Sequence, residues 1–157
     1  MSELIVVTGD EELHLKLISK SPERSAKEVL RDTLFHLEMN AKISTPQRTG
    51  NLMRSISKEG PTSLGDGHFV GSVSAGGAAT APYAVYVEKG TGIYGDKHVP
   101  IRAKTGNMLV WEEHGNTVFT RQVKGQKGQE YMQKAFIETR DVYLPARAME
   151  ESKKLAD

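Results

Sequence analysis

The amino-acid sequence predicts an α+β fold, in which an antiparallel sheet of about four to five strands packs against a long helix in the N-terminal half and a C-terminal helix. Three observations predict it. Apolar residues recur at helical spacing before residue 45, short strand-like runs broken by glycines fill the middle, and helical spacing returns from Gln129 onward. The length of 157 residues suits a single domain over 1–157.

The long helix has a recognisable beginning, apolar face and end. Ser21, Pro22 and Glu23 supply a cap residue, a proline at the first helical position and an acid in the first turn. Pro46 disfavours helix in the residue before it. The apolar residues at helical spacing are Ala26, Val29, Leu30, Leu34, Leu37 and Ala41. A helix of about 20 residues is therefore expected here.

Short β-branched or alternating runs predict the strands. Residues 3–7 are expected as an edge strand or an ordered arm, and strands are expected at 52–57, 68–74 and 82–89. A hairpin is expected from 108–113 and 117–123 around His114-Gly115-Asn116. In the run 82–89, Tyr83, Val85 and Val87 would share one face of the strand. The segments 59–67 and 90–107 show the least structure. The second is expected to be a long flexible loop, mobile in the free chain and ordered by a partner subunit.

Two further helical segments are expected. A short helix is predicted over residues 10–18, where acidic residues follow a capping aspartate. The later segment has Met132, Ala135 and Phe136 spaced for one face. Pro145 must end, kink or restart that helix, and a final helix is expected from there to Leu155.

The composition excludes several classes of protein. The net charge is +1, from 21 basic and 20 acidic residues, which argues against a dedicated nucleic-acid binder. The chain has no cysteine, so disulfides, thiolate zinc sites and a cysteine nucleophile are excluded. No apolar run approaches the roughly 20 residues of a spanning helix, and no basic region precedes the short N-terminal apolar stretch. We expect a soluble protein made in the cytoplasm, with no membrane partner.

The motifs that could carry chemistry lack their structural context. The stretch "GTGIYG" (90–95) matches the dinucleotide-binding pattern, but the residues after it do not predict the helix that would face a pyrophosphate. The five histidines, at 14, 36, 68, 98 and 114, show no metal-ligand spacing, and no serine has a nucleophile-elbow context. The sequence therefore predicts a protein that is not an enzyme, with no cofactor, no metal and no small-molecule substrate.

A basic cluster has two interpretations. Its members are Lys97, Arg102, Lys104, Arg121, Lys124 and Lys127. Either these side chains belong to a solvated loop, or they form a contact surface for a nucleic acid or an acidic partner, since basic patches act locally despite a neutral net charge.

The stretch "TPQRTGNLMRSI" (45–56) predicts a structural turn at Pro46, Thr49 and Gly50. Gly50 can take the positive φ that a tight turn needs. Leu52 and Ile56 would begin to bury a sheet face, although Met53 competes for the same role.

This stretch and two others resemble, in the same order, blocks of the head–tail joining proteins of long-tailed bacteriophages. The residues that match at the turn are Pro46, Thr49, Gly50, Leu52, Ser55 and Ile56. The second block is "YAVYVEKGT" (83–91), and the third is "KGQKGQEYMQKAF" (124–136). The resemblance covers about residues 10–150 and departs from the family pattern in the extended 90–107 loop. The family includes neck and tail-completion proteins and is similar to the minor tail protein Z of lambdoid phages.

The resemblance implies a non-enzymatic virion protein, made in the host bacterial cytoplasm and placed at the head–tail junction. It implies a ring of identical subunits around the DNA channel, with other connector and tail proteins as partners and non-specific contact with DNA in the channel. Glu88 and the basic cluster would supply interface or channel contacts, and Glu88 could instead pair with Arg48. The alternative function is a small nucleic-acid-binding or regulatory module that uses the basic cluster.

Overall fold

The described chain is divided into two compact units. In the computed structural model, the described residues are 5–8, 22–46 and 50–156. One unit ends at Ala84 and resumes at Tyr131, and the other is Val85–Glu130. In sequence, the second unit is inserted into the first, and the single domain expected over 1–157 stays a prediction.

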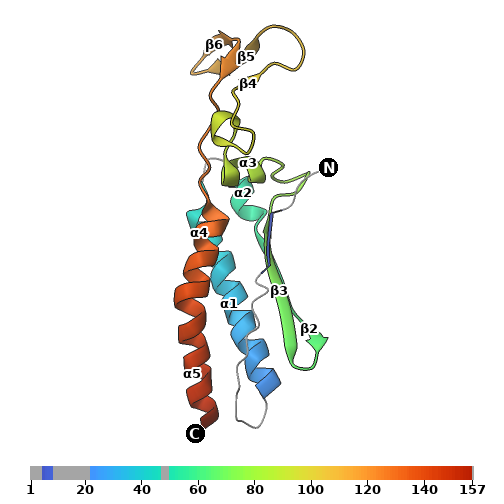
Figure 1. Ribbon diagram of the computed structural model, residues 1–157, viewed down its shortest axis with the longest axis vertical. Helices are drawn as coiled ribbons and strands as arrows, with labels where there is room; N and C mark the ends of the chain where they lie inside the picture. The colour runs from blue at the N-terminus through green and yellow to red at the C-terminus, as the bar shows by residue number, and fades with distance from the viewer. Residues whose placement is uncertain (1–4, 9–21, 47–49, 157) are drawn as a thin grey trace. The chain divides into compact units, whose positions relative to one another are not determined.

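Helix α1 (Pro22–Ser44) is the central element of the first unit and confirms the predicted long helix. It lies between the sheet on one side and the C-terminal helices on the other (Figure 1). Four of the six apolar residues predicted for its inner face are fully buried, and the other two are half-buried. The buried four are Val29, Leu34, Leu37 and Ala41. The helical spacing of these residues is therefore the pattern that builds the core.

A three-stranded antiparallel sheet packs on one side of α1 in the first unit. Its strands are β1 (Ile5–Thr8), β2 (Ser57–Gly65) and β3 (His68–Ala75), in the order β1-β3-β2. The strands predicted near β1 and β3 are confirmed. The expectation that 59–67 has little structure is wrong, because most of it is β2. This edge strand is largely exposed and polar, so no apolar alternation marked it, and a bulge accommodates Pro61, which has no N–H to donate.

A single helical turn follows Gly50 in the described part of the predicted turn. Gly50 has φ +71°, as predicted, and α2 (Asn51–Arg54) follows it. The strand predicted over 52–57 is therefore wrong for all but its last residue. Within this helical turn Leu52 faces the core, and Ile56 just after it is also buried, whereas Met53 is only half-buried. The backbone N–H of Arg54 donates to the Gly50 carbonyl at 3.0 Å, which closes the helical turn.

The C-terminal helical segment is continuous but changes pitch. It consists of α4 (Tyr131–Glu138), a π-helical turn (Thr139–Tyr143) and α5 (Leu144–Ala156). Pro145 is the second residue of α5, so the helix restarts there, one of the three outcomes predicted. Proline cannot donate an intrahelical hydrogen bond, and its ring crowds the preceding turn, so a wide π turn directly before it is physically suited to this position.

The second unit contains one hairpin and short pieces of regular structure. The chain enters it along α3 (Ala84–Lys89), whose first residue belongs to the first unit, and a 3₁₀ turn follows at Gly92–Tyr94. Two-residue strands β4 (Ile101–Arg102) and β7 (Gln122–Val123) pair with each other. The hairpin of β5 (Leu109–Glu113) and β6 (Asn116–Thr120) confirms the prediction.

The strand predicted over 82–89 is wrong, because α3 occupies most of it. Ala84 and Glu88 lie one helical turn apart and are both buried, whereas Tyr86 is exposed. An alternating run of six to eight residues cannot be told from a short helix by its pattern alone.

The α+β class itself is confirmed, with antiparallel sheets, a long N-terminal-half helix and a C-terminal helix. The short helix predicted over 10–18 lies outside the described residues. Among the helices that the structure describes, none combines the length and the apolar character needed to cross a membrane.

Candidate interaction surfaces

Two glycine-containing segments of the second unit interlock through their backbones. The amides of Thr91 and Ile93 donate to the carbonyls of Gln126 and Lys124, each at 2.8 Å. A Cβ atom on Gly92 would overlap the backbone of Lys124, and a Cβ atom on Gly125 would overlap the backbone of Thr91. Both glycines also have positive φ. Only glycine fits at these crossing points.

This interlock gives the stretch "GTGIYG" a structural role. The Gly-x-Gly spacing sets two backbones against each other, and two amides that a phosphate would need are engaged by carbonyl oxygens. The 3₁₀ turn within this stretch, Gly92–Tyr94, has only three residues, so it is not the helix that the dinucleotide motif requires. The interlock also joins the second quoted block (83–91) to the third (124–136), which are far apart in the sequence.

The structure brings two members of the basic cluster together. Arg102 and Arg121 line one open hollow of about 520 Å³, together with Asn107, Thr120 and Gln122. The Arg102 guanidinium donates to the Gln122 Oε1 from Nε at 3.3 Å and from Nη2 at 3.1 Å. Two of its five N–H groups are engaged there, so further donors remain for a ligand.

The other four basic residues are exposed and lie elsewhere in the second unit. The Lys127 ammonium lies 5.8 Å from the centre of the Tyr94 ring, a cation–π distance. The remaining three are Lys97, Lys104 and Lys124. Two of the six basic residues thus lie together along the hollow, and the other four are exposed charges apart from it.

The β5–β6 hairpin exposes apolar side chains on both of its faces. Val110 pairs with Phe119 across the strands, and their exposed fractions are 56% and 61%. On the opposite face Trp111 pairs with Val118, and Trp111 is also exposed. The two strands form a sheet of their own. A two-stranded ribbon is marginally stable alone in water, and exposed apolar side chains on it are candidates for a contact surface.

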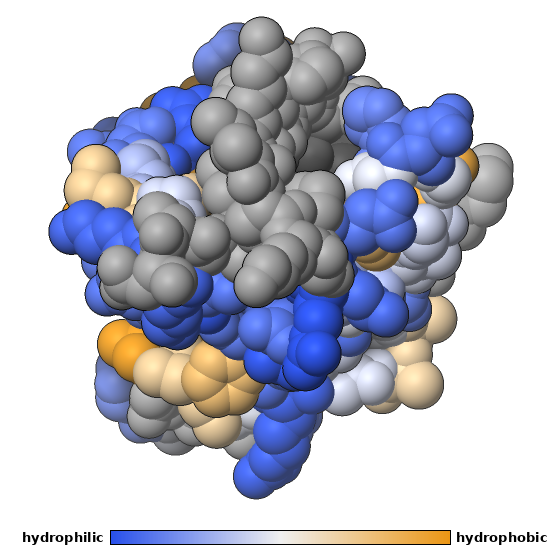
Figure 2. Space-filling model, turned by 90° about the horizontal axis from the view of Figure 1, so that it is seen from below, coloured by the Kyte–Doolittle hydropathy of each residue, from blue (hydrophilic) through white to orange (hydrophobic). Residues whose placement is uncertain are grey.

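The first unit has an apolar stripe along α1. Phe35, Met39 and Ile43 are spaced by four residues, so they lie on one side of the helix, and all three are exposed. The Lys58 ammonium lies 5.2 Å from the centre of the Phe35 ring. In the view of Figure 2, hydrophobic side chains gather in small patches among hydrophilic ones. Such patches mark contact surfaces more often than isolated exposed residues do.

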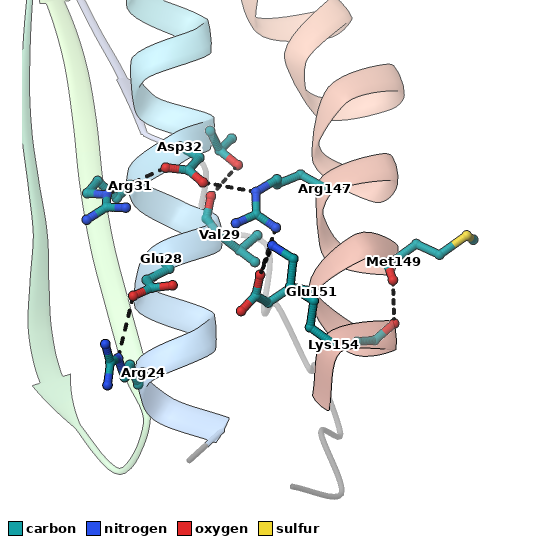
Figure 3. Close-up of polar contacts among 11 residues, drawn as sticks. Arg24, Glu28, Val29, Arg31, Asp32, Arg147, Met149, Glu151 and Lys154 are labelled. Carbon is teal, nitrogen blue, oxygen red and sulfur yellow. Dashed lines mark hydrogen bonds and ion pairs between the residues drawn. The ribbon is translucent and has the colours of Figure 1, made fainter. Parts of the chain in front are cut away.

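A charged network joins α1 to α5. Arg147 donates from Nε to Oδ2 of Asp32 and from Nη1 to Oε2 of Glu151, both at 2.9 Å, and Lys154 also reaches Glu151 (Figure 3). The hydrogen bond from Arg147 is the main cause that lowers the pKa of Glu151, with a further contribution from Lys154, against the opposing effect of burial. The bonds to Glu151 and Asp32 raise the pKa of Arg147 despite its burial. The network satisfies all three buried or half-buried charges.

A second charged group joins α1 to β2. Glu38 accepts hydrogen bonds from Lys42 and Lys58, both at 2.7 Å. Burial raises the pKa of Glu38, but the hydrogen bonds and charges of the two lysines outweigh it and leave the pKa below its ordinary value. Each carboxylate oxygen of Glu38 thus has a cationic partner.

His36 packs against the π-helical turn of the C-terminal segment. Its ring stacks on the ring of Tyr143, with the centroids 3.8 Å apart, and its Nδ1 lies 3.3 Å from the Thr139 hydroxyl. Both partners belong to the π-helical turn, more than 100 residues along the chain. No spacing in the sequence predicted this stack.

The remaining predicted site residues are dispersed. Glu88 lies in the last turn of α3 and is buried, while Pro46 is half-buried before the turn at Gly50. Thr49 and Arg48 lie outside the described residues, so the alternative role of Glu88 as a partner of Arg48 stays untested. Across the part of the chain that the structure describes, no three His, Asp or Glu side chains gather as metal ligands.

Comparison with known proteins gives no relative. No family model, no curated protein and no solved structure matches this chain. The surfaces that sequence reasoning missed are the apolar faces of the hairpin and the stripe on α1. Exposed apolar residues at strand or helix spacing read as core in a sequence, and only the fold shows which of them face solvent.

Proposed function

We propose that this chain is a non-enzymatic structural protein of the head–tail junction of a long-tailed bacteriophage or prophage. In this role it is a neck or tail-completion component and one subunit of a ring around the DNA channel. Its partners are copies of itself and the neighbouring connector and tail proteins.

The observation that carries the proposal is the apolar hairpin of the second unit. Val110 and Phe119 lie exposed on one face and Trp111 lies exposed on the other. Large exposed apolar patches are uncommon on monomeric proteins and mark interaction surfaces. A ring subunit needs such surfaces for the copies on each side and for the layers above and below. The stripe of Phe35, Met39 and Ile43 on α1 offers a second contact surface, on the first unit.

The interlock at Gly92 and Gly125 supports the resemblance on which the family part of the proposal rests. The second and third blocks resemble the family in the right order, and the close approach of Gly125 to Thr91 and of Gly90 to Gly128 packs the two blocks on each other. Two segments that pack on each other belong to the same structural feature, so a protein with the same fold would contain both of them.

Deletion of the gene from the genome that encodes the chain tests the proposal. Induced cells should yield DNA-filled heads and separate tails in electron micrographs, and a plasmid copy should restore joined particles. Normal numbers of joined, infectious particles without the gene would contradict the proposal. Mass spectrometry of purified virions gives an independent check, because a structural subunit must be present in them.

The hollow at Arg102 and Arg121 favours a second candidate, the nucleic-acid-binding module. Two arginines beside one concave surface can contact phosphates. Duplex or single-stranded DNA should then bind the purified chain with an affinity that falls steeply as salt rises. Binding that is absent at about 50 mM salt would remove this candidate.

A further inference from the structure

The two ends of the β5–β6 hairpin carry opposite charges. Glu112 and Glu113 are the last residues of β5, beside the turn, and both are exposed. At the other end of the ribbon, Arg121 directly follows β6, and Arg102 lies with it along the hollow. Strands of five residues separate the acidic tip from the basic base by about 17 Å. One chain therefore presents both halves of a complementary contact.

The apolar pair lies next to the acidic tip on the same ribbon. In the strand register Glu112 pairs with Thr117, two residues along from the pair of Val110 and Phe119. Residues two apart on a strand point to the same face, so Glu112 borders the exposed apolar pair. A surface that accepts the tip would be placed to cover Val110 and Phe119 as well.

We propose that the hairpin of one copy docks tip-first on the hollow of a second copy. The carboxylates of Glu112 and Glu113 accept hydrogen bonds from the guanidinium groups of Arg102 and Arg121, and the second copy covers the apolar pair. Because the tip and the hollow are different surfaces, the contact is heterologous and repeats in one direction from copy to copy. Its use in closing a ring rests on the proposed function, whereas the contact itself belongs to the purified chain.

A second copy fits these surfaces better than a nucleic acid does. A single strand could place phosphates at the two arginines and stack bases on Trp111 or Phe119. Glu112 and Glu113, however, lie on the same ribbon as those rings and repel phosphates. A second copy pairs all four charges and needs no component from elsewhere.

Paired charge reversals test the contact. The tip variant is Glu112→Arg with Glu113→Arg, and the hollow variant is Arg102→Glu with Arg121→Glu. Each alone places like charges in the contact, so self-association measured by analytical ultracentrifugation should weaken at least about tenfold. An equimolar mixture of the two should recover association, because the basic tip of one fits the acidic hollow of the other. A chain with all four substitutions should also associate.

Matched controls separate this effect from general changes in charge. Glu138→Arg with Glu150→Arg shifts the net charge as the tip variant does, and Lys27→Glu with Lys153→Glu shifts it as the hollow variant does. All four residues are exposed in the first unit, so both controls should associate like the wild type. Circular dichroism and melting temperature establish that every variant is folded before association is compared. A misfolded double variant is replaced by its single substitutions, Glu112→Arg and Arg121→Glu, which make the same comparison.

Several results would overturn the proposal. The first is that the wild type stays monomeric up to roughly 1 mM chain. The second is that the charge-reversed variants associate as strongly as the wild type. The third is that the two variants are folded but their mixture does not recover association. Variants that change DNA affinity without changing association would assign the hollow to nucleic acid instead. Charge-dependent association in a chain that is absent from virions would leave the contact standing and remove the phage function. Virions that assemble normally with either reversed variant would remove the contact from the ring alone.

Discussion

Arg147 on α5 bonds Asp32 on α1 across 115 positions of sequence, with the Arg147 Nε donating to Asp32 Oδ2 at 2.9 Å. The same guanidinium also binds Glu151 one turn further along α5. The Arg147 side chain is only 13% exposed. This contact favours one register of the two helices, because a shift of one turn would separate the partly desolvated Asp32 carboxylate from Arg147.

The first prediction concerns Arg147. We expect Arg147→Ala to lower the free energy of unfolding by about 1–3 kcal/mol, since two carboxylates lose their shared partner inside the helix contact. The matched control is Arg24→Ala on α1, whose pair with Glu28 is largely exposed and should contribute about 0–0.5 kcal/mol. Urea unfolding of both variants gives the comparison. Equal losses would mean that the network contributes no more than a surface pair.

The second prediction concerns pH. The pKa of Glu151 and that of Glu38 are both lowered in the folded chain, below the ordinary value of 4.5. The unfolded chain therefore binds more protons than the folded chain as these groups titrate. Stability from the two groups is complete above pH 4.5 and is lost as the pH falls through their folded pKa values.

Glu151→Gln should therefore reduce stability most near neutral pH. The difference from the wild type should shrink as the pH falls below 4.5 and through the lowered pKa of Glu151 in the folded chain, because the protonated wild-type carboxyl resembles the amide. Melting temperatures across this range, with Glu150→Gln as the exposed control, provide the measurement. A difference that stays constant with pH would show that the charge of Glu151 is not the cause.

The third prediction concerns Gly50. We expect Gly50→Ala to lower stability by roughly 1 kcal/mol or more, because alanine is strained at a φ of +71°. Contacts do not cause this loss, since the nearest atom to an added Cβ is Arg54 Nη2 at an ordinary 3.7 Å. Gly50→Asn should lose less, because asparagine tolerates the left-handed region. An asparagine variant no more stable than the alanine variant would argue against backbone strain.

The fourth prediction concerns the glycine interlock. Gly92→Ala and Gly125→Ala combine a positive φ with overlap against backbone atoms, so each should loosen the second unit by more than the roughly 1 kcal/mol of strain alone. Gly106→Ala is the matched control, because Gly106 also has positive φ but open space where the Cβ would lie. Hydrogen exchange of the Thr91 and Ile93 amides measures the loosening directly. Equal exchange in the Gly92→Ala and Gly106→Ala variants would show that the close approach is unimportant.

The fifth prediction concerns which residues are mobile within the segment 90–107, which the sequence predicts to be flexible throughout. Thr91 and Ile93 donate short backbone hydrogen bonds, and Ile101–Arg102 forms the β4 pairing, so these amides should exchange slowly. We expect fast exchange at residues 103–107 in the free chain. Protection of 103–107 at the level of Ile93, in a monomer, would contradict the expectation of a flexible segment.

Local chemistry in the sequence determined several features without tertiary structure. Pro22 and Pro46 bracket α1, and the positive φ of Gly50 follows from the absence of a side chain. The hairpin follows from His114 and Gly115, both of which take positive φ in a two-residue turn. Each of these signals acts within a few residues, so it survives whatever the rest of the chain does.

The tertiary structure decided the features whose partners lie far away in sequence. Residues 82–89 fit a strand or a helix equally well, and burial of Ala84 together with Glu88 selects the helix. The polar segment of β2 is a strand because its backbone pairs with β3. The position of the Arg147 side chain on α5 depends on its ion pair with Asp32 on α1. Periodicity shows that a helix or strand has an apolar side, but whether that side meets solvent depends on which other elements pack against it. That packing leaves Val110 and Phe119 exposed on the hairpin.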